Sequence, residues 1–568
     1  EAGENCDIMA RSPQEIAQTA TLLASQGRER EAEALFERGL AEFPNIARLA
    51  NSAGNFHFKA GRLERALMLF ERALAIDPDL VEAGVNAAIT LARMDRFAQA
   101  SALLRPLEIR ASGNAGYWRV RADVERQARL YASADASMAR AAALDPQGPQ
   151  TARSRARLSL ERGSPQVLEH IEAALRLNPG DPALLYDYAQ ALSVAGQMVE
   201  ALECTATLVR QVPGWIEGLK LHAELRWAAG DRDRFADHFE PVTAMAGAGT
   251  AVWMAWHETL AGVDRAAESA EVLARARGRW PQDSELALAH AVALGEAGQP
   301  GEAEAVFESF AGMSSPDWAT ARGRNLLRLG DIARAEAQLA DARAARPGDV
   351  SAWALTDLCW RLSDDNRHEW LHGQPGLVRQ IALRLSDAER DATIALLSEL
   401  HRHSAMPIGQ SVKTGSQTKG ALFARAEPEL ARLEAALNEA LAEYRAGLPP
   451  CDPSHPLLAR RDDPWAIVGS WSILLDGAGH HAAHIHPRGL LSSASYWLVP
   501  EEVDAPGEAG WLELGRPPPG IAEGLGSLHT VRPVVGTLVV FPSTLFHGTR
   551  PISRGRRMTV AFDVTASA

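Results

Sequence analysis

Cysteine is scarce in this sequence of 568 residues, which contains only four, far apart from one another. Their spacing matches neither a metal-binding pair nor the dense pattern of a disulfide-stabilised scaffold, so both kinds of structure are excluded. We therefore expect a protein of a reducing compartment, the cytoplasm, without a cysteine-based site. The four residues are Cys6, Cys204, Cys359 and Cys451.

Long apolar runs and a targeting segment are also lacking. No stretch reaches the roughly 18 to 20 apolar residues that a membrane-spanning helix needs. Residues 1–13 are polar and do not show the basic and apolar regions of a signal peptide. We expect no membrane partner, and the first helix is predicted to begin after Ser12, a suitable N-cap, with Pro13 as its first residue.

An excess of basic residues is absent as well. The chain has 58 Lys and Arg against 72 Asp and Glu, a formal net charge of −14 at pH 7. Nucleic-acid-binding proteins need clustered positive charge, so nucleic acid is not expected as a general partner.

The residues that are present divide the chain by composition. Ala, Leu, Glu and Arg dominate the first two thirds, whereas strands rich in aromatic residues and in Val, Ile and Thr gather near the end. We therefore predict a multidomain α plus β protein, helical in its N-terminal part and β-rich in its C-terminal part.

The helical part contains an internal repeat with an offset of 34 residues, as between Pro44 and Pro78 (78 − 44 = 34). Ala32, Leu35, Phe36, Glu37, Arg38, Leu40 and Pro44 are echoed by Ala66, Leu69, Phe70, Glu71, Arg72, Leu74 and Pro78. The closing proline recurs at Pro146, Pro179, Pro213, Pro281 and Pro347. We assign residues 14–355 to a repeat array, which fits poorly around Ser112 and Pro241.

This pattern resembles the tetratricopeptide repeat. Gly61 stands near the turn between two helices, Ala66 where the helices approach, Phe70 in the packing seam, and Pro78 after the second helix. The resemblance implies helical hairpins that stack into a superhelix with a concave groove, which binds a peptide or protein. The apolar residues themselves are interpreted as core, without chemistry of their own.

The repeat fades after residue 355, and residues 356–404 are interpreted as a helical transition. Segments 377–400 and 427–444 are amphipathic and rich in helix formers. Between them, residues 410–418 are rich in turn and β formers and predict an entry strand or loop of a last domain, residues 405–568. Within that domain, short apolar segments between Gly and Pro turns predict a barrel or sandwich: 466–475, 491–499, 510–514, 537–541 and 558–564.

Three histidines in this last domain have the spacing of a metal site. Residues i and i+2 of a strand face the same side, so His484 and His486 can point into a barrel together, and His547 on another strand can complete the site. Three neutral imidazoles suit Fe(II) or another first-row metal and leave open positions. A lone histidine is more often structural, and the remaining ones are interpreted as loop or surface residues: His455, His480, His481 and His529.

An arginine that could bind a carboxylate follows these histidines in the sequence. Arg557 lies ten residues after His547, and Thr559 shares its strand face two residues later. A guanidinium and a hydroxyl can hold a carboxylate in bidentate fashion. The alternative is a surface salt bridge within the basic run 554–557.

These motifs together resemble the prolyl-hydroxylase-like branch of the 2-oxoglutarate/Fe(II) oxygenases, over about residues 405–566. They are His-x-His at 484–486, Ser-x-x-Tyr at 493–496, Phe-Pro-Ser at 541–543 and Arg-x-Thr at 557–559. The resemblance implies a double-stranded β-helix (jelly-roll) fold with Fe(II) and 2-oxoglutarate as cofactors. By motif position it implies His484 and His547 as metal ligands, Arg557 as the partner of the distal 2-oxoglutarate carboxylate, and hydrogen bonds from Thr559 and Tyr496.

The sequence departs from this family at one position, because His486 stands where the usual motif has Asp or Glu. Either His486 is a third neutral ligand, or only two histidines bind, as in aspartyl/asparaginyl β-hydroxylase, another oxygenase preceded by tetratricopeptide-like helices. A carboxylate from elsewhere in the domain is the third alternative, with Asp476, Glu513 and Asp563 as candidates.

The sequence therefore favours an oxygenase that converts 2-oxoglutarate to succinate and CO2 while hydroxylating a peptide or protein side chain recruited by the repeat groove. One alternative is a non-catalytic binding scaffold with a degenerate oxygenase domain. Another is a three-histidine dioxygenase that does not use 2-oxoglutarate. Arg557 argues against both, since neither needs an anchor for a cosubstrate carboxylate.

Overall fold

The computed structural model describes residues 12–566, so that the prediction about Cys6 lies outside the described residues. The chain divides into two compact units, one ending at Leu184 and the other beginning at Leu185. The division falls within helix α11 (Pro182–Val194). None of the described helices combines the length and the apolar character needed to cross a membrane.

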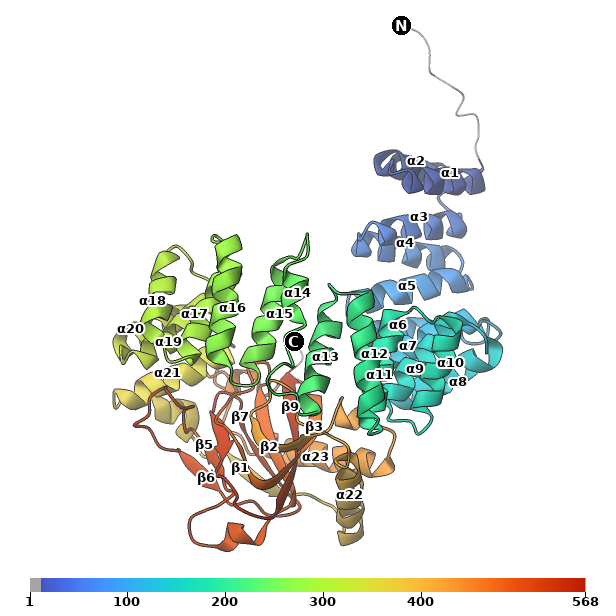
Figure 1. Cartoon of the computed structure of the whole chain (residues 1–568). Coiled ribbons are helices and arrows are strands. Elements are labelled where there is room, and N and C mark those ends of the chain that lie inside the picture. The colour runs from blue at the N-terminus through green and yellow to red at the C-terminus, as the bar shows by residue number, and fades with distance from the viewer. Residues whose placement is uncertain (1–11, 567–568) are drawn as a thin grey trace. The chain divides into compact units, whose positions relative to one another are not determined.

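The first unit consists of helices joined by short turns (Figure 1). The first of them begins as predicted, because the Ser12 hydroxyl accepts the Glu15 backbone N–H and the Glu15 carboxylate accepts the Ser12 N–H. The helices are α1 (Pro13–Ser25), α2 (Glu29–Glu42), α3 (Ala47–Lys59), α4 (Leu63–Ile76), α5 (Val81–Arg93), α6 (Phe97–Leu104), α7 (Ala115–Gln127), α8 (Tyr131–Leu144), α9 (Pro149–Glu161) and α10 (Val167–Leu177).

The α3–α4 hairpin shows why the repeat positions are occupied as they are. Phe70 and Ala66 on α4 are fully buried. A Cβ atom added at Gly54 on α3 would lie 2.5 Å from the Phe70 ring, so the approach of the two helices requires glycine there. Gly61 in the turn has a φ of +74°, a conformation that favours glycine. The predicted packing seam and turn are confirmed.

Helical hairpins continue into the second unit. Its repeat helices are α12 (Met198–Gln211), α13 (Ile216–Ala228), α14 (Phe239–Thr243), α15 (Thr250–Ala261), α16 (Ala266–Arg279), α17 (Ser284–Glu296), α18 (Pro300–Ser309), α19 (Pro316–Arg328), α20 (Ile332–Ala345) and α21 (Val350–Leu362). The poor fit predicted near Pro241 corresponds to α14, which has only five residues. Near Ser112, the eight-residue α6 is followed by a 3-10 turn, η1 (Arg105–Leu107).

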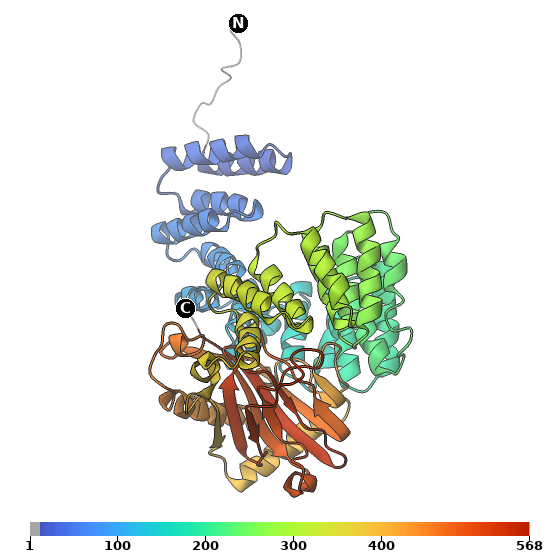
Figure 2. The same cartoon turned by 90° about the vertical axis from the view of Figure 1, so that its left-hand side faces the viewer.

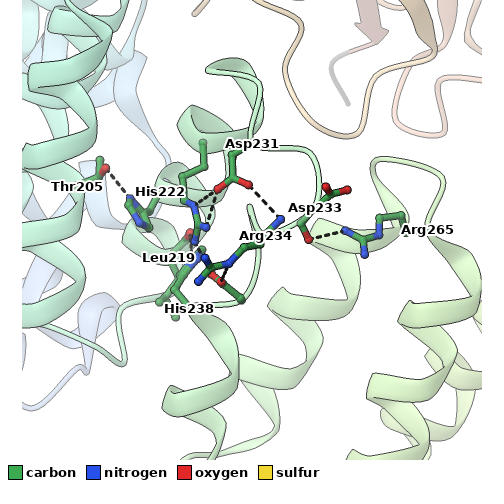
Figure 3. Close-up of polar contacts among 10 residues, drawn as sticks. Thr205, Leu219, His222, Asp231, Asp233, Arg234, His238 and Arg265 are labelled. Atoms are coloured by element: carbon green, nitrogen blue, oxygen red, sulfur yellow. Dashed lines mark hydrogen bonds and ion pairs between the residues drawn. The ribbon is translucent and has the colours of Figure 1, made fainter.

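Side-chain hydrogen bonds connect the segments of the irregular α13–α14 repeat, whose second helix is short (Figure 3). The Arg226 guanidinium donates to the carboxylates of Asp231 and Asp237. His222 and His238, packed edge to face, bond to the Thr205 hydroxyl at 2.8 Å and to the Leu219 carbonyl at 2.9 Å, respectively. Burial lowers the pKa of each imidazole to about 4, so both rings are neutral structural groups near pH 7.

The C-terminal part forms two antiparallel sheets, as a jelly-roll does (Figure 2). The six-stranded sheet has the order β1-β7-β4-β9-β3-β2, and the three-stranded sheet the order β6-β5-β8. The strands are β1 (Arg379–Ala382), β2 (Val412–Gln417), β3 (Trp465–His481), β4 (Leu491–Leu498), β5 (Leu512–Leu514), β6 (His529–Val531), β7 (Thr537–Pro542), β8 (His547–Thr549) and β9 (Arg556–Ala566). The predicted double-stranded β-helix is confirmed.

The alternation of side chains along β9 separates the core from a pocket. Met558, Val560, Phe562 and Val564 pack in the same apolar cluster as residues of helix α23 (Pro428–Ala446). The intervening residues face the other way and line a cavity of about 830 Å³: Arg557, Thr559, Ala561 and Asp563. A single strand thus supplies both the core and the functional face.

The interpretation of segment 377–400 as one helix was wrong at its beginning. Residues Arg379–Ala382 form β1, which pairs with β7, and helix α22 (Asp387–Leu400) starts only afterwards. Ile381, Leu383 and Leu385 are buried there, and the residues between them are exposed. This alternation has the period of a strand, but the surrounding helix formers obscured it in the sequence. Strand β6, only three residues long, was also missed, whereas the strand expected at His547 is present as β8.

The last repeat helix is joined to the β domain through a shared core. Leu355 and Leu358 on α21 belong to one apolar cluster with Phe546, next to His547. The Arg361 guanidinium on the same helix donates to the carbonyl of Gly515 at 2.5 Å. The end of the repeat array therefore supports the segment that leads into β8.

We expect Phe70→Ala to lower the local free energy of opening of the α3–α4 hairpin by about 3–5 kcal/mol, because it leaves a cavity in the seam. Met68→Ala on the same helix is the matched control, since this side chain is 49% exposed. Its expected effect is below about 0.5 kcal/mol. Hydrogen exchange of the full chain, measured on the α3–α4 segment, tests both, and equal effects of the two variants would contradict the assignment of the seam.

Candidate metal centre

The three predicted histidines meet where β8 begins. His547 is the first residue of β8, whereas His484 and His486 lie in the segment after β3 rather than on a strand as predicted. A single antiparallel bridge joins the two segments: the His484 N–H donates to the His547 carbonyl at 3.0 Å, and the reverse bond is 2.9 Å long. This bridge fixes the two backbones against each other at the site.

The ring nitrogens of these residues converge on one point. One ring nitrogen from each lies within 4.8 Å of those of the other two. The Nε2 atoms of His484 and His486 are 3.1 Å apart, and the ring centroids of His484 and His547 are 4.2 Å apart. A cluster of this size could hold one metal ion.

The other nitrogen of each ring is engaged with an oxygen. His484 Nδ1 lies 2.8 Å from the Ala482 carbonyl oxygen, and His547 Nδ1 lies 3.1 Å from that of Leu545. Because a carbonyl oxygen only accepts, each Nδ1 carries the proton and each Nε2 is left unprotonated, with a lone pair. The backbone therefore holds these rings in the tautomer that a metal ligand needs.

Asp563 completes the same arrangement for the third ring. Its Oδ1 lies 2.5 Å from Nδ1 of His486, and the indole of Trp471 stacks on the face of that ring at a centroid distance of 5.7 Å. Of the three acids considered from the sequence, Asp563 alone touches the histidine cluster. Asp476 is exposed, and Glu513 pairs with Arg550.

Burial keeps the imidazoles of His484 and His547 in their neutral form. It lowers the pKa of His484 to about 4, with a further contribution from the neighbouring His486. Burial also holds the pKa of His547 well below its usual range. Near pH 7 the lone pairs of these rings are therefore available for a metal.

Arg557 is a buried cation that lines the same pocket. Its side chain is 1% exposed, and its Nε atom has no hydrogen-bond partner. Within residues 12–566 no carboxylate forms an ion pair with it, and burial lowers the pKa of its guanidinium. A buried charge without a counterion is costly, which is the state expected of a group that awaits an anionic ligand. The alternative of a surface salt bridge is wrong.

The two residues predicted to assist Arg557 occupy different positions. Thr559 lines the pocket from the same face of β9. Tyr496 does not line it but packs beneath, with its ring centroid 5.1 Å from the Arg557 guanidinium carbon. This cation–π contact supports the guanidinium in its orientation.

Two of the histidines interpreted from the sequence as loop or surface residues are not at the surface. His481 ends β3, lines the pocket, and stacks on His484 at a centroid distance of 6.3 Å. It was missed because β3 continues six residues beyond the predicted end at residue 475. His455 is fully buried and bonds to the Leu371 carbonyl at 3.0 Å, as a structural group of the core.

The repeat array supplies part of the pocket wall. Gly262 and Asp264, in the turn between α15 and α16, and Arg324 on α19 line the pocket together with the histidines. The Gly409 N–H donates to the Gly262 carbonyl at 2.9 Å, and Lys413 on β2 forms an ion pair with Asp264. None of these repeat residues carries a recognisable motif, so the sequence offered no signal for them.

Family models match segments in both parts of the chain. Residues 469–563 match the family model described as "Putative 2OG-Fe(II) oxygenase". Tetratricopeptide-repeat models match residues 18–81, 57–124, 165–225 and 320–359. The two resemblances inferred from the sequence are thereby confirmed. No curated protein matches the chain.

Solved structures similar to this chain are tetratricopeptide-repeat proteins. One from Parabacteroides merdae has 16% identity and a TM-score of 0.36, covering 44% of this chain and 98% of its own. TTC0263 from Thermus thermophilus has 24% identity and a TM-score of 0.28, covering 32% and 99%, respectively. YrrB, described as having an unusual peptide-binding site, has 15% identity and a TM-score of 0.24, covering 39% and 96%.

We expect Asp563→Asn to weaken divalent metal binding by about 10–100-fold, because the amide cannot accept from His486 Nδ1 with the strength of a carboxylate. Anaerobic titration with Co(II), followed by visible absorption, measures this affinity. Asp476→Asn removes the same charge from an exposed position and should leave the affinity unchanged. An unchanged affinity in Asp563→Asn would show that the carboxylate does not support a metal-binding imidazole.

Proposed function

Starting from the match of residues 469–563 to the 2-oxoglutarate/Fe(II) oxygenase family, we propose that the chain is such an oxygenase and hydroxylates a peptide or protein side chain. The observation that carries this proposal is one pocket that combines three converging imidazoles with a buried arginine lacking a counterion. The first group suits a metal, and the second suits the carboxylate of a cosubstrate.

The donor set fits Fe(II). His484, His486 and His547 offer three neutral nitrogen ligands, and His486 takes the place of the usual carboxylate. Asp563 does not take a ligand position itself but accepts a hydrogen bond from Nδ1 of His486. This hydrogen bond makes the imidazole a more basic ligand. The negative charge of Asp563 remains close enough to offset part of the charge of a divalent ion. This arrangement favours the three-histidine alternative over binding by two histidines alone.

The residues around Arg557 fit 2-oxoglutarate. The guanidinium can bind the distal carboxylate with two parallel N–H···O bonds, and the Thr559 hydroxyl on the same strand face can add a third. The Tyr496 ring holds the guanidinium from behind. Phe541, Ile473 and Leu512 also line the pocket and provide an apolar wall that limits the access of water to bound groups.

When bound, the metal and 2-oxoglutarate supply the oxidising chemistry, with succinate and CO2 as the products of the cosubstrate. The chain itself contributes position. The backbone carbonyls of Ala482 and Leu545 keep the ring tautomers fixed, and Arg557 fixes the orientation of the cosubstrate relative to the histidines. Such preorganisation removes the need for reorganisation during turnover.

The size of the pocket and the origin of its wall support a macromolecular substrate. A cavity of about 830 Å³ is larger than a metal and a five-carbon diacid require, so a substrate side chain can enter beside them. Part of its wall comes from the repeat array, and tetratricopeptide repeats generally bind proteins or peptides. We therefore assign to the repeats the task of presenting the substrate side chain to the pocket.

Two alternatives make different demands on Arg557. A non-catalytic scaffold with a degenerate oxygenase domain has no use for a buried, unpaired guanidinium, which destabilises the fold unless an anion binds. A three-histidine dioxygenase without 2-oxoglutarate would likewise leave it unused. The retained Arg557 therefore favours an oxygenase that uses 2-oxoglutarate.

Succinate formation by anaerobically Fe(II)-loaded protein, started with 2-oxoglutarate and O2, tests the proposal. We expect slow turnover that His547→Ala abolishes and for which Arg557→Ala raises the KM for 2-oxoglutarate on the order of 100-fold, since a buried charge-assisted pair is lost. Arg556→Ala is the matched control, because this neighbouring side chain is exposed and lies outside the pocket lining. No turnover, together with no metal-dependent 2-oxoglutarate binding, would favour the scaffold.

A further inference from the structure

One cation in the pocket has no role in the proposed chemistry and comes from the repeat array. Arg324 lies on α19 and is among the residues that line the pocket containing the three histidines. The side chain is deep in the protein, where burial lowers the pKa of the guanidinium, yet 36% of its surface remains exposed. This combination is what a residue at the wall of an open pocket should show.

Arg324 is poorly neutralised by its surroundings. Its only carboxylate partner within residues 12–566 is Glu296, at 3.6 Å, and the same Glu296 oxygen lies much closer to Arg328, at 2.5 Å. The Nε atom of Arg324 has no hydrogen-bond partner. Because the ion pair with Glu296 is long and shared, the terminal N–H groups of this guanidinium are available to a group inside the pocket.

The other charges that line the pocket do not serve this purpose. Lys413 and Asp264 neutralise each other, and Asp563 is engaged with His486. Arg557 is assigned to the cosubstrate. Arg488 also lines the pocket and is exposed, so it adds positive charge without neutralising Arg324. The part of the pocket left for the substrate thus has a positive potential.

We propose that the pocket selects an acidic substrate, a peptide whose carboxylate is held by the Arg324 guanidinium while a neighbouring C–H bond is presented to the metal site. This deepens the proposed function and rests on it for the hydroxylation step. A planar guanidinium pairs with a carboxylate through two parallel hydrogen bonds, whereas the isosteric amide of Asn or Gln offers one acceptor and no charge. Arg324 would therefore determine specificity from the repeat array, outside the β domain.

Binding of labelled peptide pools to the full chain tests this inference. The pools are random and end in an amide, and their central residue is Asp, Glu, Asn or Gln. Fluorescence anisotropy is measured under argon with Mn(II) and 2-oxoglutarate, so that no turnover occurs. We expect the Asp or Glu pool to bind at least about 10-fold more tightly than its amide counterpart, and Arg324→Gln to reduce this preference to within about 2-fold.

Two further variants separate recognition from folding. Arg334→Gln on the next helix removes the same charge outside the pocket lining, from an arginine that pairs with Glu304, and should retain the preference. Arg324→Lys keeps the charge but not the bidentate geometry, and should retain part of it. Equal loss in Arg324→Gln and Arg334→Gln would overturn the proposal. It would also be overturned if the acidic and amide pools bound the unmodified chain equally and a free C-terminus added no Arg324-dependent binding.

The remaining outcomes distinguish the source of the carboxylate and the role of the site. One further pool has a neutral central residue and a free C-terminus. If this pool alone binds and Arg324→Gln abolishes its binding, the proposal is supported, and the C-terminal carboxylate of the peptide is the group that Arg324 holds. A rise in the KM for 2-oxoglutarate in Arg324→Gln, like that in Arg557→Ala, would overturn it, since Arg324 would then hold the cosubstrate. Absence of succinate formation with an intact, Arg324-dependent acidic preference would refute the oxygenase but not the recognition of a carboxylate.

Discussion

The antiparallel bridge between His484 and His547 is the interaction on which the site depends. Two reciprocal backbone hydrogen bonds, 3.0 and 2.9 Å long, join a segment that is not a strand to the first residue of a three-residue strand. Without this bridge, neither short segment has enough regular structure to hold a ring in place. Carbonyls within the same two segments accept from Nδ1 of each ring, so the backbone that positions the imidazoles also selects their tautomers.

The rest of the domain can be understood as support for that bridge. On one side, the β9 strand places Asp563 behind His486 and Arg557 in the pocket, while its alternate residues pack against α23. On the other side, Phe546 packs in a cluster with α21, the last helix of the repeats. His372 lies behind this segment and bonds to the Thr544 hydroxyl at 2.9 Å. Core packing and site geometry are therefore coupled through residues adjacent to His547.

Local periodicity accounts for what was predictable from the sequence. The 34-residue repeat located Phe70 in its seam, and the two-residue period placed Arg557 and Thr559 on one strand face. Periodicity failed where elements are short or tertiary contacts decide: β6 has three residues, and His481 lies beyond the predicted end of β3. The pocket residues of the repeats could not be found at all, because their role depends on chain segments about 150 residues apart coming together.

The replacement of a ligating carboxylate by His486 changes less than the motif suggests. In the usual arrangement a carboxylate binds the metal directly. Here the carboxylate of Asp563 contacts the His486 imidazole instead, with 2.5 Å between Oδ1 and Nδ1. In the proposed metal site the negative charge is therefore retained but lies further out, where it would polarise His486 rather than occupy a coordination position. A metal held by three neutral nitrogens attracts anions more strongly than one held by a carboxylate. The anionic cosubstrate that we propose to bind at Arg557, a residue of the pocket lining, would be the ligand best suited to exploit that difference.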